Sequence, residues 1–240
     1  MNIIKISHKY HKWLMLFLGL QFVIWSVTGV YMVFIDIDYI HGDSLVKNQQ
    51  LRINSKNINY SLAQLIDDYP NAKDITLGKF INADVYRLTR AGSSYLIDAS
   101  TGKLLSPLSK KQIIAAAHYY YAGKADISNI ELISDDPPFE LNQRHLPAWG
   151  VNFDHYSLPT LYISAQHGGL VGKRHQFWRI FDWMFRFHIM DYGDEAHSSN
   201  VLLLIITVLS ILGCFTGLVL IYVKVIRVYT SGMFRRDRVN

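Results

Sequence analysis

Two long apolar runs lie near the two ends of the chain, Trp13–Ile35 and Val201–Val223, and neither contains a charged residue. A helix needs roughly 20 apolar residues to cross the hydrocarbon core of a bilayer. The pattern therefore predicts two transmembrane helices, which run antiparallel because the chain crosses once in each direction. Residues 36–200 are expected on one side of the membrane, and the tails 1–12 and 224–240 on the other.

Between the two runs, a helical pattern followed by two strand-like patterns occurs twice. Apolar residues at helical spacing precede runs that alternate in polarity or are rich in β-branched residues. The first copy, about 61–107, comprises a helix at Ser61–Tyr69 and strands at Ile75–Leu88 and Ser94–Leu105. The second copy, about 110–174, comprises a helix at Lys110–Tyr121 and strands at Trp149–Asp154 and Thr160–Val171. This order predicts an α+β domain made of two similar helix–strand–strand halves.

The second strands of the two copies can be aligned residue by residue. The alignment pairs Tyr95 with Tyr162, and Gly102, where a tight turn is expected, with Gly169. Residues Asp126–Pro147, which follow the helix of the second copy and precede its first strand, are rich in proline and acidic residues. That composition favours a loop or a partly extended insertion.

A short amphipathic helix is expected directly after the second copy, at about 176–190. The segment Gln176–Tyr192 holds seven aromatic residues in 17, with two arginines among them. Its charged residues would cost about 2.5–3.5 kcal/mol each at the bilayer centre, so the segment is not expected to span. Two placements remain open: a helix on the outer membrane surface, or an ordinary core helix of the domain.

The charged residues predict the orientation in the membrane. Eight of the 24 basic residues and one of the 19 acidic residues lie in the two tails, which leaves 16 basic and 18 acidic residues elsewhere. Short flanks rich in Lys and Arg stay in the cytoplasm, so both termini are expected there and the middle domain in the periplasm. The domain itself carries no basic excess, which argues against a nucleic-acid partner. The first run exceeds the apolar length of a signal peptide and has no small-residue cleavage site after it, so we expect it to remain as an anchor.

Few residues of the usual cofactor and catalytic sites are present. The only cysteine, Cys214, lies inside the second run, so the chain can form no internal disulfide and no cysteine-rich metal site. No serine-hydrolase, zinc-protease, phosphate-loop or dinucleotide motif occurs. We therefore assign no catalytic residue and predict no flavin or nicotinamide site in this chain.

The two spans can be paired by depth if Ile35 and Val201 lie at the same level. Small residues then face each other at 19 and 217, at 26 and 210, and at 29 and 207. Such residues let membrane helices approach closely. Gly213 and Gly217 also form a GxxxG pattern, which could instead serve a partner subunit.

Histidine is the residue type that most suggests chemistry, because several of the ten histidines lie at the ends of the spans. Imidazole is a usual ligand of haem iron and of transition metals. His11 precedes the first span, whereas His41, His188 and His197 are expected near the outer surface. His41 and His188 could form one axial pair; alternatively, these histidines anchor helix ends at the interface. The candidate cofactor residues are thus His11, His41 and His188, and any metal is unknown.

The start of the chain resembles the PepSY-associated transmembrane family. Members open with His-Lys-Trp-Leu-like text and carry Thr-Gly inside the helix, here His11–Leu14 and Thr28-Gly29. The expected Gly after Trp-Leu is Met15, a departure from the pattern. The first copy is similar to a PepSY domain, whose second strand carries Asp-x-x-Thr-Gly, here Asp98, Thr101 and Gly102; the second copy matches less well.

The resemblance implies a bacterial inner-membrane protein with a periplasmic PepSY-like domain. Some relatives are iron-regulated reductases that carry haem between histidine-bearing helices, which implies haem b as the cofactor. One reading is therefore a subunit of a periplasm-facing system for electron transfer or ferric-siderophore reduction, working with a reductase or other membrane protein, or as a homodimer. The alternative reading is a non-catalytic binding, sensing or peptidase-regulating module that acts through a membrane partner.

Overall fold

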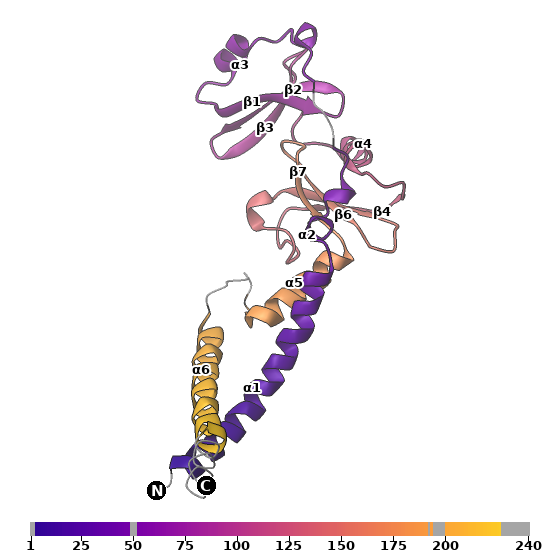
Figure 1. The fold of residues 1–240 in the computed structure, drawn as a ribbon. Coiled ribbons are helices and arrows are strands. Elements are labelled where there is room, and N and C mark those ends of the chain that lie inside the picture. Colours follow the sequence, from indigo (N-terminus) through magenta and orange to yellow (C-terminus); the bar gives the residue numbers. More distant parts are fainter. Residues whose placement is uncertain (1–2, 49–51, 192, 194–199, 227–240) are drawn as a thin grey trace, which may run out of the picture. The chain divides into compact units, whose positions relative to one another are not determined.

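The computed structural model describes residues 3–48, 52–191, 193 and 200–226 (Figure 1). The chain divides into two compact units. The helical unit holds the described residues up to Phe34 and from Phe181 onward, and the sheet unit holds Ile35–Ile180. The fold is thus a mixture of helix and sheet, with the helices that resemble membrane spans gathered in one unit.

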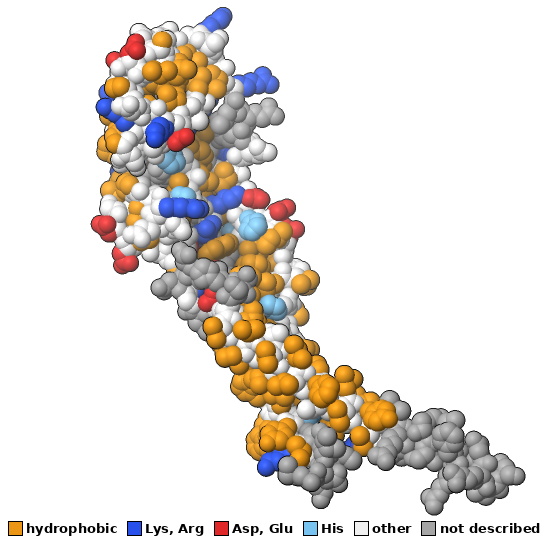
Figure 2. All heavy atoms as spheres, turned by 90° about the vertical axis from the view of Figure 1, so that its left-hand side faces the viewer, with side chains coloured by type: hydrophobic (Ala, Val, Ile, Leu, Met, Phe, Trp, Pro, Cys, Tyr) orange, Lys and Arg blue, Asp and Glu red, His pale blue; other side chains and the backbone are white. Residues whose placement is uncertain are grey.

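The helical unit is built on two long helices, α1 (Ile3–Phe34) and α6 (Val201–Ile221), the latter continuing as a π-helical stretch over Tyr222–Ile226. Residues 8–34 and 201–224 are long and apolar enough to cross a membrane. Only 11% of the most apolar window of each helix is buried inside the protein. Figure 2 shows hydrophobic side chains covering the surface of these helices. A core helix of a soluble protein would bury most of them, so the exposed apolar surface favours lipid as its surroundings.

The depth at which the two helices pair differs from the prediction. A Cβ atom on Gly19 would meet nothing within 4 Å, whereas one on Gly217 would lie 3.1 Å from Cε1 of His11. Gly29 faces His188, not Thr207. The pairing is therefore displaced by about two helical turns. Val201 and Ile35 do not share a depth, because Met190, at the end of the preceding helix, packs with Leu18 of α1 and Ile206 of α6.

The two glycines of the GxxxG pattern serve the contact between α1 and α6. A Cβ atom on Gly213 would lie 3.1 Å from Cδ1 of Leu18 and within 4 Å of Met15 and Leu14. Gly217 lies against His11 one turn further along. Their missing side chains admit α1, as small residues do at membrane helix interfaces.

The sheet unit contains two antiparallel sheets, each preceded by a helix. The first half comprises α3 (Leu62–Asp68), β1 (Lys73–Phe80), β2 (Ala83–Arg90) and β3 (Ser93–Asp98). The second half comprises α4 (Lys110–Tyr120), β4 (Ile127–Ile133), β5 (Ala148–Phe153), β6 (Thr160–Ser164) and β7 (Leu170–Arg174). Within each sheet the strands follow one another in sequence order. Short helical segments lie at Ile37–Ile40 (α2), Asp43–Leu45, Ser55–Asn57 and Gln143–His145.

Helices α3 and α4 begin with the same cap. The hydroxyls of Ser61 and Ser109 accept hydrogen bonds from the backbone N–H three residues on, and Gln64 and Gln112 bond back to the cap backbone. This capping box satisfies two N–H groups that a helix start leaves unpaired. The cap explains why both predicted helices begin at or beside the expected residue.

One face of the first sheet shares a core with the second half. Val85 of β2 and Leu96 of β3 pack with Ile113 of α4 and with Val151 and Leu161 of the second sheet. The next residues along β2 and β3, such as Tyr86, point to the opposite face and pack against Leu65 of α3. The first sheet therefore lies between α3 on one side and the shared core on the other.

The segment predicted as a loop or a partly extended insertion, Asp126–Pro147, is extended in part, because it contains strand β4. Its apolar residues Ile127, Ile130 and Ile133 recur every third position, not every second. The pairing with β5 shifts between Ile127 and Asn129, the mark of a β-bulge. An extra residue in a strand breaks the alternation by which strands are found. Two predicted strands are wrong in extent. The run Ile75–Leu88 covers most of the hairpin of β1 and β2, and the run Thr160–Val171 covers β6 and the start of β7.

The alignment of the two halves is wrong by one residue. The N–H of Gly102 donates to the carbonyl of Asp98, and the N–H of Gly168 donates likewise to Ser164. The side chains of Asp98 and Ser164 each accept from the backbone two and three residues on. Gly102 and Gly168 also share a positive φ, of 73° and 65°. Gly102 thus corresponds to Gly168, not Gly169, and a slip of one residue reverses the face of every side chain.

The aromatic segment forms α5 (Gln176–Ile189), as predicted. The helix begins in the sheet unit and ends in the helical unit. Its placement on a membrane surface stays a prediction.

Candidate functional site

The imidazole of His188, near the end of α5, is hydrogen-bonded to a threonine of α1. Nδ1 of His188 lies 2.9 Å from Oγ1 of Thr28, which is 4% exposed. The Thr28 hydroxyl donates its single proton to the carbonyl of Ile24 at 2.8 Å. In the tautomer with its proton on Nδ1, His188 would donate to this oxygen and Nε2 would carry the lone pair. Nε2 of His188 makes no hydrogen bond to the residues that the structure describes.

The end of α5 that carries His188 is fixed by two further hydrogen bonds. Nε1 of Trp25 donates to the carbonyl of His188 at 2.6 Å, and Nδ2 of Asn200 donates to the carbonyl of Ile189 at 2.8 Å. Asn200 also caps α6 by accepting from the N–H of Leu203. These contacts satisfy carbonyls that a helix end leaves unpaired. They hold α1, α5 and α6 together around the imidazole.

His11 repeats this arrangement at the other end of α1. Its Nδ1 lies 3.0 Å from Oγ1 of Thr216 on α6, and the Thr216 hydroxyl donates to the carbonyl of Gly213 at 2.9 Å. As for His188, the ring is held through Nδ1, and Nε2 has no hydrogen-bond partner in the described part of the chain.

Each imidazole lies against a Thr-Gly pair of a neighbouring helix. Thr28 is followed by Gly29, whose missing Cβ would lie 3.6 Å from His188, and Thr216 is followed by Gly217, whose missing Cβ would lie 3.1 Å from His11. In each pair the threonine fixes the ring and the glycine makes room for it. Metal-binding histidines are oriented in this way, with one ring nitrogen held by a partner and Nε2 directed to the metal.

The two histidines cannot ligate the same iron. His11 lies on α1 itself, and His188 contacts α1 at Thr28, seventeen positions further along the helix. At 1.5 Å per residue this separates the two levels by about 25 Å. Each imidazole would therefore belong to a separate site, one near each end of α1.

The structure does not test the predicted pairing of His41 with His188. His41 caps the C-terminus of α2 in the sheet unit, and its side chain is exposed. His197 lies outside the described residues. No group of three histidine, cysteine or acidic side chains suited to a metal ion occurs among the residues that are described.

An open apolar hollow of about 500 Å³ lies on the surface of α1, at the level of His188. It is lined by Gly29, Val30, Val33 and Phe34. Because a Cβ atom on Gly29 would lie 3.6 Å from His188, the hollow and the imidazole lie at the same turn of α1.

The buried charged residues of the sheet unit serve the fold. Nε and Nη2 of Arg179, on α5, donate to the Glu140 carboxylate at 2.6 and 2.8 Å, and Nη2 also donates to Thr160. The hydroxyl of Tyr162 donates to the same carboxylate at 2.7 Å. Burial and the neighbouring carboxylate raise the pKa of Tyr162 well above its ordinary value. This network, which the sequence did not reveal, ties the start of α5 to β6.

The remaining buried histidines also have structural partners. Nε2 of His175 donates to the carbonyl of Tyr39 at 2.7 Å, and its Nδ1 accepts from the N–H of Trp178. Nδ1 of His167 accepts from the N–H of Gly169. Burial lowers the pKa of both imidazoles. Neither ring is therefore arranged as a metal ligand.

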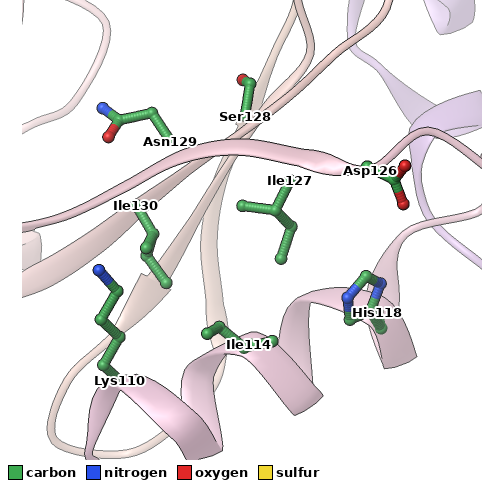
Figure 3. Close-up of a pocket in the computed structure, with 8 residues that line it drawn as sticks. All are labelled: Lys110, Ile114, His118, Asp126, Ile127, Ser128, Asn129 and Ile130. Atoms are coloured by element: carbon green, nitrogen blue, oxygen red, sulfur yellow. The ribbon is translucent and has the colours of Figure 1, made fainter.

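A second candidate site lies on the sheet unit, between α4 and β4. This open groove has a volume of about 460 Å³. Figure 3 shows Ile127 and Ile130 of β4 pointing toward Ile114 of α4, while Ser128 and Asn129 point away. Lys110 lies at one end of the groove, and His118 and Asp126 lie at the other (Figure 3). The groove is thus apolar along its centre and charged at its ends.

The comparisons with known proteins identify no relative. No family model, no curated protein and no solved structure matches this chain.

Proposed function

We propose that this protein is a membrane-anchored subunit of a periplasm-facing electron-transfer system, such as one that reduces ferric or siderophore-bound iron. Its two apolar helices cross the inner membrane with both termini in the cytoplasm, and its PepSY-like domain lies in the periplasm. The orientation rests on the basic tails, and the PepSY assignment rests on the sequence resemblance. The aromatic helix α5 lies at the outer membrane surface.

The observation that carries the proposal is the pair of threonine–histidine hydrogen bonds. They hold Nδ1 of His11 and of His188 to a neighbouring helix, so that the other ring nitrogen, Nε2, is the atom that would ligate iron. His188 and His11 would each hold one haem b, and haem supplies one-electron transfer when bound. The described residues offer one oriented imidazole at each level, so the second axial ligand would come from His41, from a second copy of the chain or from a partner subunit.

A visible spectrum tests the proposal directly. The full chain is purified in mild detergent from cells supplied with ample haem, and spectra are recorded before and after dithionite. We expect a Soret band that sharpens and shifts on reduction. His188→Ala and His11→Ala should each remove part of the absorbance, while His118→Ala, an exposed histidine of α4, should leave it unchanged. A featureless spectrum of the wild-type protein would end the haem proposal.

The groove between α4 and β4 supports a second candidate function. In this alternative the protein is a non-catalytic binding or sensing module, which presents its periplasmic domain to a partner protein. The groove lies entirely in the sheet unit and needs no cofactor. A colourless protein that co-purifies with one membrane partner in fixed ratio would favour this function over electron transfer.

A further inference from the structure

Strand β4 presents a free edge. Among the described strands it pairs with β5 alone, at the end of the four-stranded sheet. The backbone N–H and C=O groups of alternate residues in an edge strand point away from the sheet without a ladder partner. Ser128, Asn129 and Glu131 are exposed along β4. Over its seven residues the strand offers about 23 Å of backbone to another extended chain.

Helix α4 forms a wall beside this edge. Lys110, Ile114 and His118 are four residues apart and therefore share one face of the helix. Ile127 and Ile130 of β4 point toward this face (Figure 3). An extended chain laid along β4 would thus place every second side chain against isoleucines and the others toward solvent.

Charge distinguishes the two ends of the groove. Lys110 lies beside Ile130, at the first turn of α4, and Lys111 follows it (Figure 3). Neither lysine forms a salt bridge with a described residue, and the helix N-terminus adds positive potential at the same place. At the opposite end, Asp126 lies near His118 (Figure 3). The Lys110 end is therefore complementary to a carboxylate.

We propose that this groove binds an extended segment of a partner protein, which adds to β4 as an antiparallel fifth strand. An acidic group of the segment contacts Lys110, and the apolar side chains that follow pack on Ile114, Ile127 and Ile130. Backbone hydrogen bonds supply affinity and the alternate side chains supply specificity, as in other cases of strand addition. The proposal rests on the second candidate function and is independent of haem.

A designed peptide tests the proposal on the full chain in lipid nanodiscs. The probe is Ac-Gly-Ser-Glu-Thr-Val-Thr-Val-Thr-amide, labelled with fluorescein on the serine hydroxyl, and binding is followed by fluorescence anisotropy. The probe places one glutamate and two valines on the same face. We expect saturable binding, weakened about tenfold when the glutamate is replaced by lysine. A free C-terminal carboxylate in place of the amide should not strengthen binding, because an antiparallel strand places its C-terminus at the Asp126 end of the groove.

Two protein variants provide the matched comparison. Lys110→Glu should reverse the preference, so that the lysine peptide binds better than the glutamate peptide. Lys111→Glu makes the same change of charge on a neighbour that does not line the groove, and it should alter affinity much less. Both lysines are exposed on α4, so folding should be preserved. Equal binding of the two peptides to Lys110→Glu would contradict the assigned carboxylate site.

Backbone N-methylation tests strand addition itself. Methyl groups on the amides that pair with β4 should weaken binding about five- to tenfold each, while methyl groups on the intervening amides should have little effect. The same effect at every position would rule out strand addition. Tighter binding of a peptide with the sequence of residues 127–133 would overturn the choice of partner in favour of a second copy of this chain. If no peptide binds while a membrane partner still co-purifies with both wild type and Lys110→Glu, the groove proposal fails and the binding function stands.

Discussion

Nδ1 of His11 lies 3.0 Å from Oγ1 of Thr216, so that the first and last helices of the chain are joined by a side-chain hydrogen bond. The same pair of residue types joins α5 to α1, through His188 and Thr28. In both cases the threonine hydroxyl is already engaged with a carbonyl of its own helix. The threonine therefore sets the direction of the imidazole.

Removing one threonine hydroxyl should weaken the histidine as a ligand. Thr28→Val keeps the shape of the side chain and removes its hydroxyl, whereas Thr28→Ser keeps the hydroxyl. Loss of the partner that orients a ligating histidine costs about 10–100-fold in metal affinity. We expect Thr28→Val to lower haem content and to shift the midpoint potential, and Thr28→Ser to retain both. Titration of the haem-free protein with hemin, with the potential measured on the loaded form, checks this; equal affinity in the two variants would contradict the assigned role of Thr28.

The depth at which α1 and α6 pair can be tested by cysteine cross-linking. With Cys214 replaced by alanine, the pair Leu14→Cys and Gly213→Cys should form a disulfide, because the side chain of Leu14 is directed at residue 213, with its Cδ2 3.6 Å from the Cβ position there. The pair Gly19→Cys and Gly217→Cys should not, because residue 19 faces open space. The extent of cross-linking is read from mobility on a denaturing gel. If only the pair at 19 and 217 formed a disulfide, the helices would pair at the depth expected from the sequence and not at the depth described above.

Much of the helical unit could be predicted from the sequence, because lipid-exposed helices are recognised by composition alone. The relative depth of the helices could not, because it depends on Met190, Leu18 and Ile206 packing where α5 ends. The sequence places Thr28-Gly29 in a family-like pattern, but it does not indicate that this pair contacts His188. Nothing in the sequence indicates that His188 reaches Thr28 from a different helix.

In the sheet unit, the sequence pattern predicts the helices better than the strands. Both helices were found because their apolar spacing and caps agree, while β4 was missed because a bulge removed its alternation. The two halves were aligned one residue out of register because Gly168 and Gly169 are adjacent, and only the hydrogen bonds of the turn distinguish them. The sequence indicates that Arg179 would be costly inside a membrane, but it does not indicate the partner of Arg179. That partner, Glu140, lies in the segment expected to be a loop or a partly extended insertion.

Breaking the Arg179–Glu140 pair should destabilise the sheet unit strongly. The Glu140 side chain is 4% exposed and that of Arg179 is 22% exposed. Loss of one partner of a buried pair costs about 3–5 kcal/mol, and the partial exposure of Arg179 places the expected cost of Arg179→Met at about 3 kcal/mol. Tyr162→Phe removes only a hydroxyl and should cost about 1 kcal/mol. Urea unfolding of the full chain in micelles, followed by tryptophan fluorescence, measures both.

A second ion pair on the same helix provides the control for Arg179→Met. Arg186 and Asp182 are four residues apart on α5, with Nε 2.8 Å from the carboxylate. Pairs at this spacing contribute about 0.3–0.5 kcal/mol. Asp182→Asn should therefore change the unfolding free energy by less than about 1 kcal/mol. The Arg186 and Asp182 side chains are also largely buried, at 14% and 16% exposed, so the two pairs differ mainly in that this one lies within a single helix. A cost equal to that of Arg179→Met would mean that the Glu140 network contributes no more than such a pair.

Acidification should destabilise the sheet unit through His175 and His167. Burial lowers the pKa of both imidazoles in the folded protein, and Arg179 near His175 and Arg87 near His167 lower it further. The unfolded chain therefore binds protons at a higher pH than the folded one. The stabilisation is present in full above the ordinary histidine pKa of about 6.5 and is lost as the pH falls from there toward the folded pKa values. Each histidine can contribute a slope of up to about 1.4 kcal/mol per pH unit.

The variant His175→Gln isolates one of the two titrations. Its amide can donate to the carbonyl of Tyr39, as Nε2 of His175 does, but it does not take up a proton. Urea unfolding at pH 7, 6 and 5 should show a shallower fall in stability than for wild type, whereas His118→Gln, at an exposed position, should follow wild type. Asp98 and Asp43, whose pKa values are lowered by their hydrogen bonds, titrate below this range and do not contribute. Equal slopes for wild type and His175→Gln would show that protonation of His175 is not coupled to folding.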